Sequence, residues 1–130
     1  VFRGDDGLDE ITLATSTSVL TIGNGEITSD RIDAKDFTLA SAPISALVGG
    51  DATENARITK AIFAGEKGAP RDAVLLNAAA AIAAFDGEMT QGIHERISKS
   101  LSKAIAAVDS GAATKLLDRW IALSQELSAN

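Results

Sequence analysis

The stretch Gly49-Gly50-Asp51-Ala52-Thr53-Glu54-Asn55-Ala56 divides the chain into two patterns. Before it, apolar and polar residues alternate as in a β-strand, whereas after it apolar residues recur about every 3.6 residues, as on one face of a helix. Asp51 and Glu54 have the spacing of a capping box, in which each side chain accepts a hydrogen bond from a backbone N–H group. The sequence therefore predicts a β-rich part over about 1–48 and a helical part over 51–128.

The β-rich part contains the signals of an antiparallel hairpin. Residues 18–22 are apolar and β-branched, Gly23-Asn24-Gly25 tolerate positive φ, and 26–28 resume the extended pattern. A short turn is therefore expected to join two strands. The other elements expected here are strands over 11–14 and 30–36 and, after a turn at Pro43, a brief helical segment over 44–48.

About four packed helices are expected in the second part, so that the whole chain forms one α/β fragment, 1–130. The first expected helix starts at Asp51 and is ended by Gly65 and Gly68, and the second covers 71–85. The third starts at Thr90, and the fourth starts after Ser110. Residues 71–85 are apolar on nearly every side, which is typical of a helix buried on most faces. Asn77 within this run is expected to be a buried tether, because an unpaired amide is costly. The residues expected to face the core are Ile58, Ala61 and Ile62, then Ile93, Ile97, Leu101, Ile105 and Val108, and finally Leu116, Leu117, Trp120, Leu123 and Leu127.

Composition limits the classes of function. The 130 residues suffice for one domain with a modest core, and the absence of cysteine excludes disulfides and cysteine-bound metals. The net charge of -6 argues against binding to nucleic acid or an anionic membrane, because both need basic patches. The apolar run 73–85 is too short to span a bilayer, so a cytoplasmic protein is expected. Because Val1-Phe2 reads like the end of a buried strand, we expect the chain to be part of a longer polypeptide.

A glycine-bracketed acidic loop near the start is the strongest candidate site. In Arg3-Gly4-Asp5-Asp6-Gly7-Leu8-Asp9-Glu10-Ile11, the adjacent carboxylates of Asp9 and Glu10 offer hard oxygen ligands. Mg²⁺ prefers one or two protein carboxylates together with substrate phosphates, so the pair predicts a magnesium site. Neighbouring residues of an extended chain point in opposite directions, so the pair is able to serve two ions. Asp5 and Asp6 could extend this site, but we expect them to be solvated loop residues.

Other polar residues are expected to have structural roles. Gly49-Gly50 lacks the lysine of a phosphate loop, and the Asp51 carboxylate would repel an anion at that helix end. His94 lies on a polar helix face without a nucleophile beside it, so a surface position is expected. Arg71 at a helix start is electrostatically unfavourable and is expected to have a specific partner. The candidate partners are Asp72, Asp86 and a segment outside this chain.

Three stretches, in this order and spacing, resemble the C-terminal part of the α/β domain of anthranilate phosphoribosyltransferases. They are Gly7-Leu8-Asp9-Glu10-Ile11, residues 49–56 and the run from Arg71-Asp72 to Ala79, and the resemblance extends from Val1 to about Leu127. It implies a phosphoribosyltransferase or nucleoside phosphorylase-like α/β domain. It also implies that the parent enzyme transfers the phosphoribosyl group of phosphoribosyl pyrophosphate (PRPP) to anthranilate in tryptophan biosynthesis. Asp9 and Glu10 would hold its Mg²⁺, and the resemblance implies no catalytic residue within this chain.

The resemblance also indicates what this chain lacks. The family's Gly-Thr-Gly-Gly-Asp phosphate loop, its anthranilate-site residues and its homodimer contact belong to regions outside these residues. The isolated chain is therefore expected to be inactive. Arg3 stands where the family has a histidine, and Ala14-Thr15-Ser16-Thr17 replaces a Thr-Gly-Pro-Thr turn.

Three alternative functions stay open from the sequence. A pyrimidine nucleoside phosphorylase-like enzyme shares the broader architecture, but it has no magnesium pyrophosphate for Asp9-Glu10 to bind. A non-catalytic homologue of the same fold that binds nucleic acid is disfavoured by the net charge of -6. The third alternative is a folding or interaction unit without activity of its own.

Overall fold

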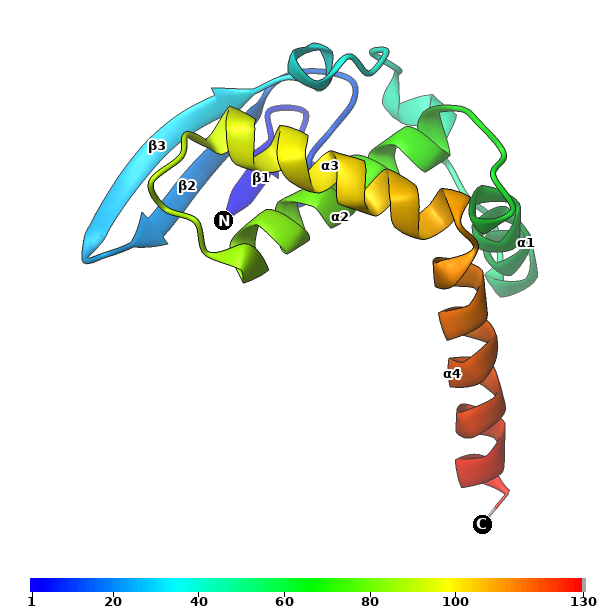
Figure 1. The fold of residues 1–130 in the computed structure, drawn as a ribbon. Coiled ribbons are helices and arrows are strands. Elements are labelled where there is room, and N and C mark those ends of the chain that lie inside the picture. Colours follow the sequence, from blue (N-terminus) through cyan, green and yellow to red (C-terminus); the bar gives the residue numbers. More distant parts are fainter. Residues whose placement is uncertain (130) are drawn as a thin grey trace.

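The computed structural model describes residues 1–129 as an antiparallel sheet followed by helices (Figure 1). The elements are β1 (Phe2–Gly4), β2 (Thr17–Gly23), β3 (Glu26–Ile32), the 3-10 helices η1 (Ala34–Phe37) and η2 (Ile44–Leu47), α1 (Ala52–Phe63), α2 (Ala69–Asp86), α3 (Ile93–Asp109) and α4 (Ala112–Ser128). The strands lie in the order β1-β2-β3. The predicted fold class, antiparallel strands followed by four helices, is confirmed. No described helix combines the length and apolarity needed to cross a lipid bilayer.

The predicted hairpin between β2 and β3 is confirmed. Ile22 pairs with Ile27 and Gly23 pairs with Glu26, which leaves Asn24-Gly25 as a two-residue turn. Both turn residues have positive φ, 52° and 80°, as the favoured hairpin turns require. The expectation of a separate strand over 30–36 is wrong. β3 continues to Ile32, and η1 follows because Asp33 and Asp36 form a capping box at its start.

The segment 11–14, expected to be a strand, is instead an irregular and mostly buried segment. The Thr12 N–H donates to Thr17 Oγ1 over 3.2 Å, and the Leu13 carbonyl accepts from the Ala42 N–H over 3.1 Å. Its backbone groups are thus satisfied by a side chain and a distant loop. No strand partner is required, although the residues are apolar enough to suggest one.

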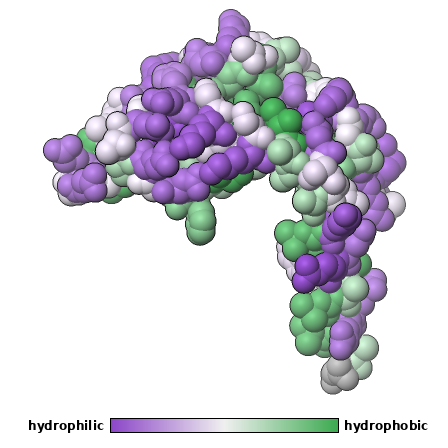
Figure 2. Space-filling view, viewed as in Figure 1, coloured by the Kyte–Doolittle hydropathy of each residue, from purple (hydrophilic) through white to green (hydrophobic). Residues whose placement is uncertain are grey.

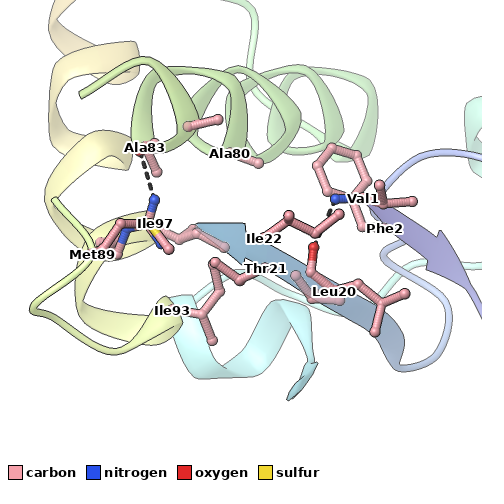
Figure 3. Close-up of a pocket in the computed structure, with 13 residues that line it drawn as sticks. Val1, Phe2, Leu20, Thr21, Ile22, Ala80, Ala83, Met89, Ile93 and Ile97 are labelled. Carbon is pink, nitrogen blue, oxygen red and sulfur yellow. Dashed lines mark hydrogen bonds between the residues drawn. The ribbon is translucent and has the colours of Figure 1, made fainter. Parts of the chain in front are cut away.

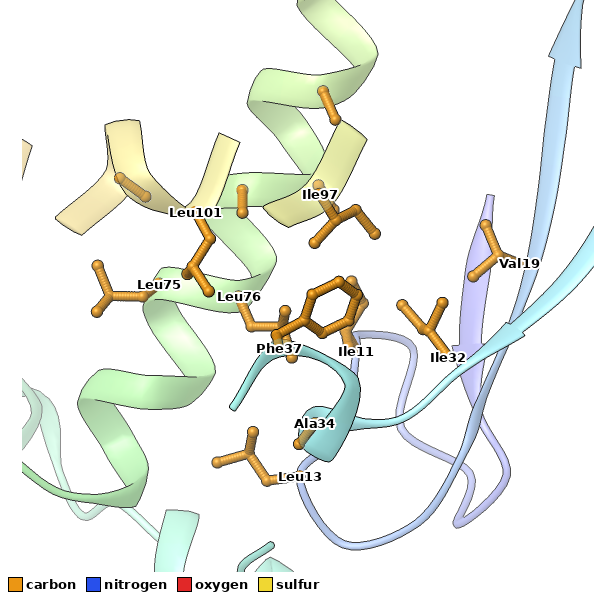
Figure 4. Close-up of a cluster of buried hydrophobic side chains, with 14 of the residues drawn as sticks. Ile11, Leu13, Val19, Ile32, Ala34, Phe37, Leu75, Leu76, Ile97 and Leu101 are labelled. Carbon is orange, nitrogen blue, oxygen red and sulfur yellow. The ribbon is translucent and has the colours of Figure 1, made fainter. Parts of the chain in front are cut away.

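The hydrophobic core lies between the sheet and the pair α2 and α3 (Figure 4). Along β2, Thr17 and Val19 are buried whereas Ser18 and Leu20 are exposed, as the two-residue period of a strand requires. The core also contains Leu75, Leu76, Ala79 and Ala83 of α2 and Ile97, Leu101, Ala104 and Val108 of α3. The alanines let the two helices approach closely. The expected stripe of the third helix is confirmed, although α3 begins at Ile93 rather than Thr90, with Gly92 as its N-cap.

α2 is buried or half-buried on most of its faces, as expected, although Val74 and Phe85 are 41% and 92% exposed. The expectation for α4 is wrong. In α4, none of the residues 112–128 is buried, and Leu116, Trp120, Leu123 and Leu127 face solvent rather than a core. Their pattern is that of an amphipathic helix, but no described segment lies against this face.

Asp51 caps the start of helix α1, as predicted. The Asp51 carboxylate accepts a hydrogen bond from the Glu54 N–H over 2.9 Å. The Glu54 carboxylate binds Arg57 over 2.7 Å instead of closing the capping box, and this hydrogen bond lowers the pKa of Glu54. Ile62 is buried, and Ile58 is half-buried.

Replacing Asp51 with alanine is expected to lower the free energy of unfolding by about 1 kcal/mol, because the Glu54 N–H loses its acceptor. Urea unfolding followed by circular dichroism measures this change. Thr53→Ala, in the exposed first turn of the same helix, is the control and is expected to cost less than about 0.5 kcal/mol. Equal costs for both variants would contradict the cap.

Candidate metal-binding loop

The acidic loop joins β1 to β2 and is closed by its own backbone. The Gly4 N–H donates to the Leu8 carbonyl over 2.9 Å, and the Asp5 N–H donates to the Ser16 carbonyl over 2.9 Å. Gly7 has a φ of 99°, a conformation that glycine adopts without strain. A Cβ at Gly4 would lie 2.5 Å from Asp6 Oδ1. The glycines at 4 and 7 therefore permit the tight path that presents Asp9 and Glu10.

Asp5 and Asp6 both have partners and do not extend the acidic site. Asp5 is exposed, as expected of a solvated position, whereas Asp6 is half-buried, so that expectation is wrong for Asp6. Asp6 accepts hydrogen bonds from the Leu8 N–H over 3.1 Å and from the Thr12 hydroxyl over 2.5 Å. Asp5 forms an ion pair with Arg31 at the surface. Both carboxylates stabilise the shape of the loop.

Arg31 was not singled out by the sequence. The strand register places Arg3 of β1 and Arg31 of β3 on either side of Ser18 of β2. The three residues form one cross-strand row of the sheet next to the loop. Arg3, Asp5, Ser18 and Arg31 line a shallow depression there. Only the pairing register of the strands would have predicted that these four residues lie together, and the sequence does not reveal that register.

Asn77 of α2 fixes the end of the acidic loop. Its Oδ1 accepts from the Ile11 N–H over 2.9 Å, and its Nδ2 donates to the Ile11 carbonyl over 3.0 Å. The same Nδ2 donates to the Ala73 carbonyl over 3.0 Å, which orients the amide on its own helix. The predicted tether is confirmed. Because Ile11 directly follows Glu10, the tether anchors the carboxylate pair to the helix.

Asp9 and Glu10 are both exposed. Among the described residues they have no hydrogen-bonding or ion-pair partner, in contrast to Asp5 and Asp6. Residues 1–129 also contain no group of three or more His, Asp or Glu side chains able to hold a metal ion by themselves. Two free carboxylates on an anchored loop fit a cation that takes its remaining ligands from phosphate and water, as Mg²⁺ does.

The remaining candidates have structural roles. Asn55 accepts from the Gly50 N–H over 2.9 Å and donates to the Gly50 carbonyl over 3.0 Å, so the glycine pair is held by a side chain, as the structural interpretation predicted. His94 is exposed and stacks on Phe37, which confirms a surface position.

Arg71 is buried, and its partner is none of those expected. Its Nη2 donates to Asp109 Oδ1 of α3 over 2.5 Å. The pair joins the start of α2 to the end of α3. The sequence missed Asp109 because 38 residues separate the two side chains.

An apolar pocket lies between β2 and the pair α2 and α3 (Figure 3). Phe2, Ile22, Met89 and Ile97 contribute to its walls, and the lining contains neither a carboxylate nor a histidine. Arg96 supplies its charge, and the Arg96 Nη2 donates to the Ala83 carbonyl over 3.0 Å. The pocket therefore offers no carboxylate or imidazole to act as an acid or a base.

The acidic loop, its tether and the paired helices lie within a region that matches a known protein family. A family model described as "Glycosyl transferase family, a/b domain" matches residues 1–114, including the whole acidic loop, the Asn77 tether and the paired helices α2 and α3. The chain belongs to this family.

Individual members of the glycosyl transferase family are similar over more of the chain. Anthranilate phosphoribosyltransferase of Rhodococcus jostii is 46% identical over 130 residues, which is 100% of this chain and 36% of that protein. The crystal structure of anthranilate phosphoribosyltransferase from Thermus thermophilus has a TM-score of 0.78 at 32% identity and covers 94% of this chain and 34% of its own. This glycosyl transferase domain is therefore homologous to anthranilate phosphoribosyltransferases and spans about a third of their length.

A more distant structure shares the fold. Anthranilate phosphoribosyltransferase from Saccharomyces cerevisiae, solved in complex with PRPP and Mg, has a TM-score of 0.77 at 23% identity. It covers 90% of this chain and 32% of its own.

Proposed function

We propose that this chain is the C-terminal part of the catalytic α/β domain of an anthranilate phosphoribosyltransferase. The whole enzyme transfers the phosphoribosyl group of PRPP to the amine of anthranilate, a step of tryptophan biosynthesis. The observation that supports this most is the anchored loop with the free carboxylates Asp9 and Glu10, in a chain 46% identical along its full length to such an enzyme. The S. cerevisiae enzyme that shares the fold binds PRPP and Mg.

In the proposed reaction, the C1–O bond to pyrophosphate breaks, a C1–N bond to anthranilate forms, and the amine loses a proton. Asp9 and Glu10 would hold Mg²⁺ beside the leaving group. Bound Mg²⁺ would neutralise the negative charge that pyrophosphate acquires as it departs. Asn77 contributes by holding the backbone of Ile11, so that the two carboxylates do not have to be ordered when metal and PRPP arrive.

The isolated chain is expected to be inactive. The phosphate loop and the residues that contact anthranilate would come from the two thirds of the enzyme that this chain does not span. Catalysis by positioning requires both substrates to be held in one geometry, which this part cannot do by itself.

The test is a chimera in which this chain replaces the matching third of the R. jostii enzyme. The loss of anthranilate fluorescence in the presence of PRPP and Mg²⁺ measures turnover. Turnover by the chimera, together with none by the isolated chain, would support the proposal. A chimera that is folded and binds PRPP but leaves anthranilate unchanged would contradict it.

A further inference from the structure

A second pocket lies between the β2–β3 hairpin and the turn that joins α2 to α3. We call it the hairpin pocket. Its volume is about 360 Å³, and Thr21, Asn24 and Thr28 give it polar walls. The surface over the hairpin tip and the outer face of α3 is mostly hydrophilic (Figure 2). Because the acidic loop enters β2 at Thr17 and the hairpin turn leaves β2 at Gly23, the hairpin pocket is separate from the candidate metal-binding loop.

Arg96 brings a buried positive charge to the hairpin pocket and to the apolar pocket. Arg96 is only 7% exposed, and its Nη2 donates to the Ala83 carbonyl over 3.0 Å. Its Nε is also buried, but this N–H group has no hydrogen-bonding partner among the described residues. A buried guanidinium group with a free N–H and no carboxylate beside it is strongly unfavourable. Arg96 therefore requires an acceptor of negative charge.

The carboxylates nearest to Arg96 in the fold do not neutralise it. Asp86 and Glu88 share a small cavity with Arg96, but each binds a lysine instead. Asp86 accepts from Lys103 over 2.6 Å, and Glu88 accepts from Lys99 over 2.8 Å. Within residues 1–129, no ion pair joins Arg96 to a carboxylate. The free N–H of this guanidinium group thus points to the anionic group of a ligand.

Strand β3 brings two carboxylates to the hairpin pocket. Asp30 pairs with Val19, whose side chain is buried, so the Asp30 side chain lies on the face of the sheet that is turned toward the helices. Glu26, four residues earlier, lies on the same face. Both residues line the hairpin pocket, and in the described part of the chain neither carboxylate has a hydrogen-bonding or ion-pair partner. The pocket therefore holds one unpaired cation and two unpaired anions that do not contact each other.

We propose that the hairpin pocket binds a free α-amino acid with an apolar side chain. The ligand carboxylate accepts a hydrogen bond from the Arg96 Nε, and the ligand ammonium group donates to the carboxylates of Asp30 and Glu26. Met89 and Ile93 line both pockets, so the apolar side chain of the ligand extends from the hairpin pocket into the apolar pocket (Figure 3). This site goes beyond the proposed function and does not rest on it, because all of its residues belong to this chain.

Ligands with a single charge fit the hairpin pocket less well. A plain anion is attracted by Arg96 but repelled by the two carboxylates of β3, and a plain cation is repelled by the buried guanidinium group. A ligand that carries both charges satisfies both sides of the pocket. Gln91 offers a further acceptor to the ammonium group, because its side-chain oxygen is buried without a partner among the described residues.

Calorimetric titration of the chain with L-leucine, L-methionine and L-phenylalanine tests the site. The amino acid that binds most tightly is then compared with its own two analogues. For L-leucine these are 4-methylpentanoate, which lacks the ammonium group, and L-leucinamide, which lacks the carboxylate. Each analogue is expected to bind at least about tenfold more weakly than the amino acid, because it loses one charge-assisted hydrogen bond.

Substitutions assign each charge of the ligand to its partner. Asp30→Asn is expected to weaken the amino acid at least about tenfold and to leave the analogue without an ammonium group almost unaffected. Arg96→Gln is expected to do the reverse, weakening the amino acid but not the analogue without a carboxylate. The two residues lie on different elements, so a folding defect in one variant leaves the other as a test. Glu95→Gln, an exposed charge beside Arg96 that does not line the pocket, is the control and is expected to change neither affinity.

Several outcomes would overturn the proposal. These are no binding of any of the three amino acids, equal affinities for the amino acid and an analogue, and an equal loss of affinity in Glu95→Gln and Asp30→Asn. The same titration of the R. jostii chimera is expected to give the same affinities, and binding to the chain but not to the chimera would also overturn the proposal. None of these readouts needs PRPP or anthranilate, so a chimera that binds the amino acid without converting anthranilate would overturn the proposed function alone.

Discussion

In the active chimera, Asp9→Asn and Glu10→Gln are each expected to lower kcat/KM for anthranilate by about 10²-fold to 10³-fold, the usual cost of removing an electrostatic stabiliser of a leaving group. Each substitution keeps the size of the side chain and removes its charge. A neutral amide oxygen is a poorer ligand for a hard cation than a carboxylate. Initial rates measured over a range of Mg²⁺ concentrations are expected to show a higher Mg²⁺ requirement in both variants.

Asp5→Asn is the matched control for this experiment. Asp5 lies in the same loop, but its carboxylate is paired with Arg31 at the surface, where ion pairs contribute little. Its removal is expected to leave the Mg²⁺ requirement unchanged. If Asp9→Asn and Glu10→Gln kept the parent's rates and Mg²⁺ dependence, the metal assignment would be wrong.

The parts of the fold that the sequence predicts correctly depend on short-range chemistry. The hairpin requires positive φ at Asn24-Gly25, and α1 requires an acceptor at Asp51, so local residues decide both. The prediction of a strand over 11–14 is wrong because the backbone of this segment is hydrogen-bonded by side chains and a loop instead of a neighbouring strand. The apolar run predicts that Asn77 is a tether, but its partner Ile11 lies 66 residues away, and no local pattern identifies that partner.

The error on α4 has a different origin. An amphipathic pattern shows that one face of a helix should be covered, but it does not identify the covering surface. The sequence therefore predicts the apolar face of α4 correctly and assigns it to the wrong partner, the core of this chain.

Some residues of the candidate site are also predicted by the sequence, whereas others are found only in the structure. Asp9 and Glu10 are found from residue type and spacing, because the metal chemistry depends on two adjacent carboxylates. Their neighbours are not found in this way, since only the tertiary structure pairs Asp5 with Arg31. The sequence thus identifies the candidate ligands, whereas the supports of the loop require the structure.

The support with the largest expected effect on stability is Asn77. Asn77→Ala removes both hydrogen-bonding partners of the Ile11 backbone, and Ile11 is only 2% exposed. Leaving a buried donor or acceptor unpaired costs about 1–3 kcal/mol, so a loss of about 2–3 kcal/mol in the free energy of unfolding is expected. Urea unfolding of the isolated chain measures it. In the active chimera, the same variant is expected to raise the Mg²⁺ requirement although both carboxylates remain.

Asn55→Ala is a closely matched control, because Asn55 binds the N–H and carbonyl of Gly50 just as Asn77 binds those of Ile11. The difference is burial, since Asn55 and Gly50 are exposed and water replaces the lost hydrogen bonds. Asn55→Ala is therefore expected to cost less than about 1 kcal/mol and to leave the Mg²⁺ requirement unchanged. Similar costs for the two variants would mean that burial of Ile11 does not make the tether strong. An unchanged Mg²⁺ requirement in Asn77→Ala would mean that the tether stabilises the fold without positioning Asp9 and Glu10.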